Sequence, residues 1–251
     1  MLEMLDRHTD DFKDALALDL SRPRPESFLT ELGVLRNEVA IMLDRLDDWM
    51  KPRKDTEKEL VNQLDEVLVL PSPLGVIAVI ASWCAPVLLT LLPVATAVAA
   101  GNCVILKPSE VAGSTAKLLE RLLPQYLDQD AVSVVQGGAE QAIHLAAESS
   151  LGKIVFSGRA ETGKHIARAA AANLTPVVLQ CGGKSPAVVH TLKYILRCEV
   201  ALRKADVQAH VKSKCGRKLS TNHYSKIMCE LCVTNSKGQW QLRNGMGTGG
   251  V

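Results

Sequence analysis

Residues 67–106 form a run of forty positions without a single Asp, Glu, Lys or Arg. A membrane helix would need about 20 uninterrupted apolar residues, whereas prolines and glycines divide this run into short pieces. Residues 75–81 are apolar and rich in β-branched side chains, which predicts a parallel strand buried on both faces. We expect a helix from Pro86 to residue 100 and a second strand over 103–106. The run therefore predicts two parallel strands joined by a crossover helix, and no transmembrane span.

The same alternation of strands and helices continues along the chain. It predicts helices over residues 112–123, 138–149 and 160–172, and strands over residues 131–136, 153–157 and 176–180. This order is typical of an α/β fold with a doubly wound parallel sheet and helices on both faces. In such open sheets, ligands bind where the strands end.

Helical patterns precede the sheet. Residues 1–19 read as one amphipathic helix. From Phe28 to Trp49, apolar residues recur in alternating steps of four and three, which places them on one stripe of a long helix. We interpret this stripe as a helix laid on the domain core, with a coiled-coil seam as the alternative. A helix over 57–64 and a short strand over 67–70 complete this part.

The charge pattern sets the last part of the chain apart. The net charge is +2, but residues 191–251 hold 11 Lys and Arg against 3 acidic residues, which gives +8, and the first 190 residues carry −6. Such a change suggests a basic tail of a different kind of sequence. Without a motif or aromatic stacking positions, we expect no nucleic-acid partner. Seven cysteines without a secretory signal favour the cytoplasm.

A glycine turn follows the strand over 153–157. A glycine at a strand exit lets the backbone approach a ligand, and the next helix offers N–H groups to a phosphate. The turn shares seven positions with a P-loop, but His165 stands where magnesium binding needs Ser or Thr. A purely structural turn is the other alternative. The candidate residues are Gly158, Arg159, Ala160, Glu161, Thr162 and Gly163.

Three stretches, residues 73–83, 100–110 and 174–186, together with this turn, resemble the NAD(P)-dependent aldehyde dehydrogenase superfamily. The resemblance covers roughly residues 10–190 and is strongest to the class 3 type, which acts on fatty and aromatic aldehydes. It implies oxidation of an aldehyde to a carboxylic acid with NAD or NADP as cofactor. In this family a cysteine thiolate attacks the aldehyde, and a glutamate activates the water that hydrolyses the thioester.

The resemblance also implies cofactor contacts. Lys107 and Glu110 fall where the family binds the adenosine ribose, and residues 158–163 fall where it meets the pyrophosphate. Trp83 lies on the cofactor side of the first strand, and Gly182 and Gly183 fall beside the nicotinamide. A solvated lysine and a carboxylate at a helix start are the alternatives for Lys107 and Glu110.

The catalytic positions depart from the family pattern. Cys84 replaces the asparagine that holds the oxyanion, and Gln180 replaces the general-base glutamate. No Gly-Gln-x-Cys sequence, the family's context for the nucleophile, occurs in the chain. Cys181 is a poor substitute, because cysteine in a buried strand is usually inert. We therefore expect a truncated family member that keeps the cofactor half and lacks catalysis.

We divide the chain into an N-terminal helical part of the cofactor domain (1–66), the dinucleotide-binding domain (67–190) and the basic tail (191–251). In the tail, four residues of the types that bind zinc lack recognised spacing, so we predict no metal site: Cys215, His223, Cys229 and Cys232. Two alternatives to the enzymatic function remain. One is a cofactor- or partner-binding protein, forming a homodimer or a heterodimer with a related chain; the other is a splice or frame-shifted product without function.

Overall fold

The computed structural model describes residues 1–54, 66–182, 233–234 and 240–241. The chain divides into two compact units, Met1–Gly183 and Lys184–Val251. In the second unit, β8 (Val233–Thr234) pairs antiparallel with β9 (Trp240–Gln241). The predicted helix over 57–64 and the four zinc-type residues of the tail lie outside the described residues.

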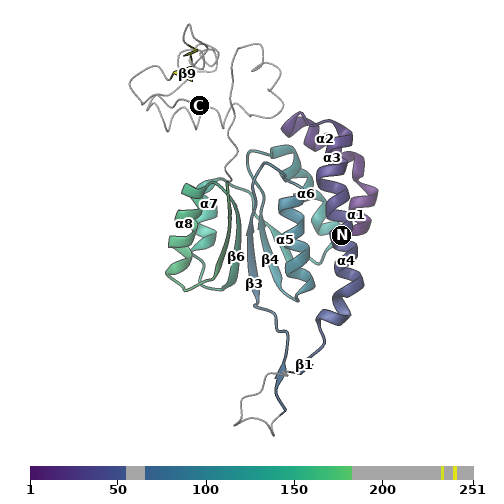
Figure 1. Ribbon diagram of the computed structural model, residues 1–251, viewed down its shortest axis with the longest axis vertical. Coiled ribbons are helices and arrows are strands. Elements are labelled where there is room, and N and C mark those ends of the chain that lie inside the picture. The colour runs from purple at the N-terminus through teal and green to yellow at the C-terminus, as the bar shows by residue number, and fades with distance from the viewer. Residues whose placement is uncertain (55–65, 183–232, 235–239, 242–251) are drawn as a thin grey trace. The chain divides into compact units, whose positions relative to one another are not determined.

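A five-stranded sheet forms the centre of the first unit (Figure 1). Its order is β5-β4-β3-β6-β7, and every neighbouring pair is parallel. This confirms the predicted doubly wound fold. The chain leaves β3 toward β5 on one side and returns to β6 on the other, so the topological switch point lies between β3 and β6. The strands are β3 (Val76–Ile80), β4 (Cys103–Lys107), β5 (Val132–Val134), β6 (Leu151–Gly158) and β7 (Val177–Cys181).

Helices cover both faces of the sheet, and each face has its own apolar core (Figure 1). On one face lie α5 (Leu88–Ala99) and α6 (Gly113–Tyr126). On the other lie α7 (Ala139–Ala146) and α8 (Ala160–Ala171). Among the described residues, no helix is both long enough and apolar enough to cross a bilayer. The cytoplasmic location stays a prediction.

The N-terminal helices form an outer layer against α5 and α6. The helix predicted over 1–19 is interrupted at His8. Leu32, Leu35 and Val39 of the predicted stripe are buried in the same core as α5. The middle of the stripe therefore lies on the domain core, as predicted, whereas its two ends, Phe28 and Trp49, are exposed. The elements of this layer are α1 (Leu2–Arg7), α2 (Thr9–Leu20), α3 (Arg24–Ser27), a π-helical turn (Phe28–Leu32) and α4 (Gly33–Trp49).

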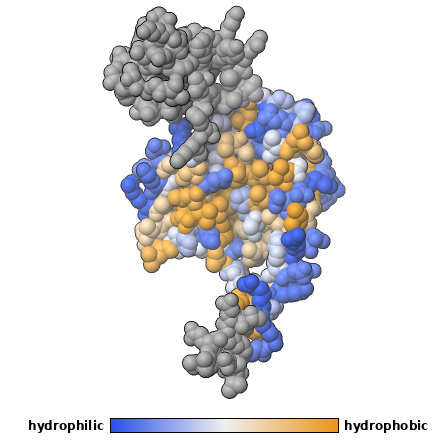
Figure 2. Space-filling view, in the orientation of Figure 1, coloured by the Kyte–Doolittle hydropathy of each residue, from blue (hydrophilic) through white to orange (hydrophobic). Residues whose placement is uncertain are grey.

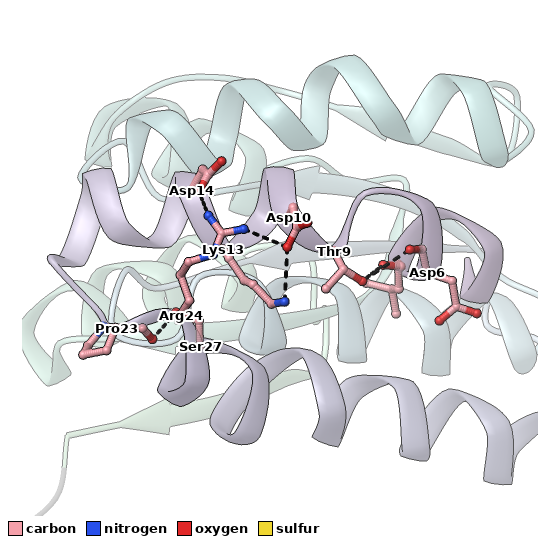
Figure 3. A network of polar contacts seen from close by, with 9 residues as sticks. Asp6, Thr9, Asp10, Lys13, Asp14, Pro23, Arg24 and Ser27 are labelled. Carbon is pink, nitrogen blue, oxygen red and sulfur yellow. Dashed lines mark hydrogen bonds and ion pairs between the residues drawn. The ribbon is translucent and has the colours of Figure 1, made fainter.

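Ion pairs join α2 to α3 within this layer (Figure 3). The guanidinium of Arg24 donates to Asp14 and, at 2.7 Å, to Oδ1 of Asp10, which also accepts from Lys13 at 3.2 Å. All three carboxylate contacts are solvent-accessible, and exposed pairs typically contribute less than about 1 kcal/mol each. The network orients α3 more than it stabilises the fold.

Two carboxylates of the outer layer cap the helices beneath it. Asp19 accepts hydrogen bonds from the N–H groups of Ser114 (3.0 Å) and Thr115 (2.8 Å) at the start of α6. At the start of α5, Glu31 accepts hydrogen bonds from the N–H groups of Val87 (2.8 Å) and Leu88 (3.0 Å). The first N–H groups of a helix have no partner within it, and the helix dipole favours negative charge there. Residues distant in sequence thus act as helix caps.

At the amino edge of the sheet, where its parallel strands begin, Asn102 joins three segments. Its Oδ1 accepts hydrogen bonds from the N–H groups of Leu74 (2.6 Å) and Gly75 (3.1 Å), and its Nδ2 donates to the carbonyl of Ala97 (3.0 Å). The sequence predicted only that this position stops a helix. The buried amide also fixes the entry to β3.

A small antiparallel pair lies beside the sheet. β1 (Arg53–Lys54) pairs with β2 (Leu68–Val69), and all four residues are exposed. β2 falls within the strand predicted over 67–70.

Candidate functional site

The predicted cofactor residues gather where the parallel strands end, which we call the carboxyl edge. Lys107 ends β4, Gly158 ends β6, and Cys181 ends β7. Trp83 and Cys84 follow the end of β3. The register fixes this arrangement, because Ile80 of β3 pairs with Lys107 on one side and with Phe156 on the other. Segments distant in sequence therefore share one edge at the switch point.

Lys107 and Glu110 are in contact, as a common role requires. The ammonium of Lys107 lies 3.3 Å from Oε2 of Glu110 and donates to the carbonyl of Pro108 at 3.0 Å. Lys107 is only 2% exposed, whereas the Glu110 side chain is 52% exposed. A buried ammonium is costly unless it is paired, and Glu110 supplies that pair. This geometry argues against a merely solvated surface lysine.

The glycine turn is shaped by the ring of Phe156, which the sequence did not single out. A side chain at Gly158 would place its Cβ 2.7 Å from Cζ of this ring, and one at Gly163 would come within 3.4 Å of it and 3.2 Å of the Cys181 sulfur. Gly163 is buried, so it serves the packing of α8 on β6 and β7. Residues 160–162 form the first turn of α8. Their N–H groups have no partner within the helix, because the first N–H groups of any α-helix lack an acceptor four residues earlier.

A chain of hydroxyl and thiol groups crosses the switch point. Ser157 of β6 donates to the Ser82 hydroxyl at 3.2 Å, and Ser82 Oγ lies 3.2 Å from the sulfur of Cys84. Cys84 is exposed and Trp83 is half-buried. The segment Ser82–Pro86, which we call the β3 loop, is therefore joined directly to the strand that leads into the glycine turn.

Beneath the β3 loop lies a buried ion pair. Arg22 pairs with Glu31, whose side chain is 0% exposed, and its Nη2 donates to the Cys84 carbonyl at 3.0 Å. Burial raises the pKa of Glu31 above its ordinary value, and the N–H groups of Leu88 and Val87 together with the guanidinium offset only part of this effect. No sequence motif marks either residue. Their role is visible only once α5 and the outer layer are packed together.

The remaining predicted residues lie on β7 and beyond it. Gln180 is exposed and pairs in register with Ser157, so the general-base position borders the same edge. Gly182 follows β7 and is exposed, whereas Gly183 lies outside the described residues. Cys181 is exposed as well, although we expected a buried strand cysteine. The reason is that β7 is an edge strand of the sheet, because among the residues that the structure describes only β6 pairs with it.

Comparisons with known proteins agree with this arrangement. The model of the aldehyde dehydrogenase family matches residues 1–194. Aldehyde dehydrogenase family 3 member A2 of Pongo abelii is 35% identical over 232 residues, covering 92% of this chain and 46% of that protein. Family 3 member B1 of Homo sapiens is 43% identical over 176 residues, covering 70% and 37%. The first alignment extends past residue 194, into the basic tail.

Solved structures give the same result. AldH of Staphylococcus aureus in a substrate-bound state superposes with a TM-score of 0.70 at 30% identity, covering 74% of this chain and 40% of that one. A Mycobacterium tuberculosis aldehyde dehydrogenase complexed with NAD+ gives 0.62 at 28% identity, covering 73% and 37%. The chain spans less than half the length of these relatives. It belongs to the aldehyde dehydrogenase family, and its curated relatives are of the class 3 type that the sequence motifs predicted.

Proposed function

We propose that this chain binds NAD or NADP at the carboxyl edge and does not oxidise aldehydes. The proposed cofactor binding is supported by three features that come together at the switch point: the Lys107–Glu110 pair, the glycine turn and the β3 loop. A dinucleotide needs hydrogen-bonding groups for its ribose and N–H groups for its pyrophosphate. The residues present supply both.

Each part of the edge suits one part of the cofactor. Lys107 offers donors and Glu110 an acceptor, the combination that ribose hydroxyls require. The first turn of α8 offers backbone N–H groups to a pyrophosphate. The Phe156 ring leaves no space for a Cβ at Gly158, and a Cβ at Gly163 would be crowded by the Cys181 sulfur and this ring. The chemistry that a nicotinamide supplies when bound is hydride transfer. A family structure at 28% identity, that of the M. tuberculosis enzyme, holds NAD+.

The proposed loss of catalysis rests on two positions. A thiol such as that of Cys84 is a weak hydrogen-bond donor, and losing one oxyanion donor typically costs about 3 to 4 kcal/mol of barrier. Gln180 cannot take a proton from water near neutral pH. These changes remove the groups that would act on an aldehyde while leaving the cofactor edge intact.

We expect calorimetric titration to show binding of NAD+ or NADP+, and no growth of reduced-nicotinamide absorbance when a long-chain or aromatic aldehyde is added. Lys107→Met should weaken binding about tenfold or more, because it removes a charged hydrogen-bonding group. The matched control is Lys117→Met, on the exposed side of α6, which should bind like the wild type. Turnover at family-like rates would refute the loss of catalysis, and absence of binding by the folded protein would refute the cofactor site.

Exposed strands favour a second candidate, a partner-binding role with a related chain. Leu68 and Val69 of β2 are 47% and 43% exposed, and Val178 and Leu179 of β7 are 50% and 42% exposed. Figure 2 shows apolar surface gathered on the face of the domain turned to the viewer. Open strand edges with apolar side chains are templates for pairing. Analytical ultracentrifugation with and without a full-length class 3 relative tests this role, and a chain that stays monomeric in both would exclude it.

A further inference from the structure

We propose that Arg22 and Glu31 are positioning residues for the β3 loop, holding it in the shape that admits the dinucleotide. Both come from the outer helical layer, and neither belongs to the carboxyl edge itself. The inference rests on the proposed cofactor site in one respect, namely that the loop borders the bound nucleotide.

Arg22 and Glu31 restrain the loop at two places from below. The guanidinium donates through Nη2 to the Cys84 carbonyl at 3.0 Å and through Nη1 to the Glu31 carboxylate. The other carboxylate oxygen accepts from Val87 at 2.8 Å and Leu88 at 3.0 Å. One ion pair thus fixes both the middle of the loop and the point where α5 begins.

The loop has a third restraint on the opposite side. Ser82, at its first position, accepts a hydrogen bond from Ser157 of β6 at 3.2 Å. Fixed at residues 82, 84 and 87–88, the loop has little freedom left around Trp83. The bond from Arg22 to the Cys84 carbonyl is exposed, but the Arg22 side chain is 16% exposed and that of Glu31 is 0% exposed, so water competes poorly for the ion pair that orients the guanidinium. The restraint is therefore effective in solution.

The fraction of molecules in which the β3 loop is ordered determines the apparent affinity for the dinucleotide. When only a fraction of molecules has the binding-competent loop, the apparent dissociation constant rises by the inverse of that fraction. Loosening the contact at the Cys84 carbonyl leaves the Lys107–Glu110 pair and the glycine turn unchanged. It should still weaken binding, because the third part of the site is no longer in place. A purely structural cap would change stability alone.

The test compares two variants of the pair with a matched control. Arg22→Lys keeps a charge for Glu31 but lacks the second nitrogen that reaches Cys84. Glu31→Gln keeps an acceptor for α5 but removes the charge that orients Arg22. The control is Asn102→Ala, which removes three hydrogen bonds of a buried side chain at the amino edge, away from the loop. Each full-length protein is titrated with NAD+ and analysed by hydrogen–deuterium exchange at a temperature where it is fully folded.

We expect both pair variants to bind NAD+ about tenfold more weakly than the wild type and to exchange faster at the amides of residues 83–85, 87 and 88. Asn102→Ala should retain wild-type affinity and exchange faster at Leu74 and Gly75 instead. Unchanged affinity of the pair variants alongside a wild type that binds would overturn the proposal. If the wild type itself does not bind, the proposed cofactor site is wrong, and exchange at residues 83–85, 87 and 88 decides whether Arg22 and Glu31 hold the loop: unchanged exchange overturns this and faster exchange supports it.

Discussion

Replacing Glu31 by alanine is expected to lower the free energy of unfolding by about 3 to 5 kcal/mol. The carboxylate accepts from two backbone N–H groups at the start of α5 and pairs with Arg22, and its side chain is 0% exposed. Glu31→Ala therefore leaves a largely buried guanidinium and two helix N–H groups without their partner. Urea unfolding followed by far-ultraviolet circular dichroism measures the change.

Glu26→Ala is the matched control, because Glu26 contacts the same arginine from an exposed position. Its carboxylate lies 3.7 Å from Nε of Arg22, and its side chain is 51% exposed. Such a pair contributes at most about 1 kcal/mol. Similar losses for the two variants would show that burial of Glu31 is not what makes it important.

The pH dependence of Glu31→Gln provides an independent check. Burial raises the pKa of Glu31 in the folded protein, whereas in the unfolded chain a glutamate titrates near its ordinary value of about 4.3. Between these two pKa values the folded state binds more protons, so the wild type loses stability as pH rises through this range. The glutamine variant has no such titration. The free energy of unfolding of the wild type minus that of Glu31→Gln should therefore fall as pH is raised from about 4 toward neutrality.

Exposed carboxylates do not obscure this difference. Hydrogen bonds from Arg36 lower the pKa of Asp6, and those from Lys13 and Arg24 lower that of Asp10, so their contributions are lost as pH falls. Both residues titrate in the wild type and in the variant, and their effects cancel in the subtraction. A difference that increases with pH would mean that Arg22 stabilises the charged form more than burial penalises it.

The sheet could be predicted from sequence because each strand carries its own signal. Buried parallel strands are continuous apolar runs, and the helix between the first two of them, α5, is followed by Gly101. Parallel topology then brings the strand ends together, which places Lys107 and the glycine turn at one edge without knowledge of side-chain positions. The fold and the position of the carboxyl edge follow from short-range patterns alone, whereas the cofactor roles of its residues were implied by the family resemblance.

The interactions that hold this edge have no such signal. Glu31 and Asp19 lie on amphipathic helices, where a carboxylate is ordinarily interpreted as solvent-facing. Each becomes a helix cap only through contacts with Leu88 of α5 or Ser114 of α6, which lie 57 and 95 residues further along the chain. Long-range pairing of this kind leaves no periodicity in the sequence. The positioning role of Arg22 could not have been found without the packed structure.

Gly152 shows a further limit of periodicity. The strand predicted over 153–157 begins in the structure at Leu151, and the register with β3 shifts between Val76 and Ile77. Val76 pairs with Leu151 and Ile77 with Lys153, so Gly152 is one extra residue, a β-bulge. The bulge turns Leu151 to the same core as Ile154, although strict alternation would place them on opposite faces.

Gly152→Ala is expected to destabilise the domain by about 3 kcal/mol, the upper end of overpacking costs. An added Cβ would lie 2.1 Å from the Leu74 carbonyl oxygen and 2.9 Å from its carbon, so backbone rather than a flexible side chain has to move. Movement there also strains the hydrogen bond from Leu74 to Asn102. Gly113→Ala, at the first residue of α6 with nothing within 4 Å of its Cβ, should be neutral or stabilising by up to about 1 kcal/mol. Equal unfolding midpoints for the two variants in urea would mean that the approach of Leu74 to the bulge does not require glycine.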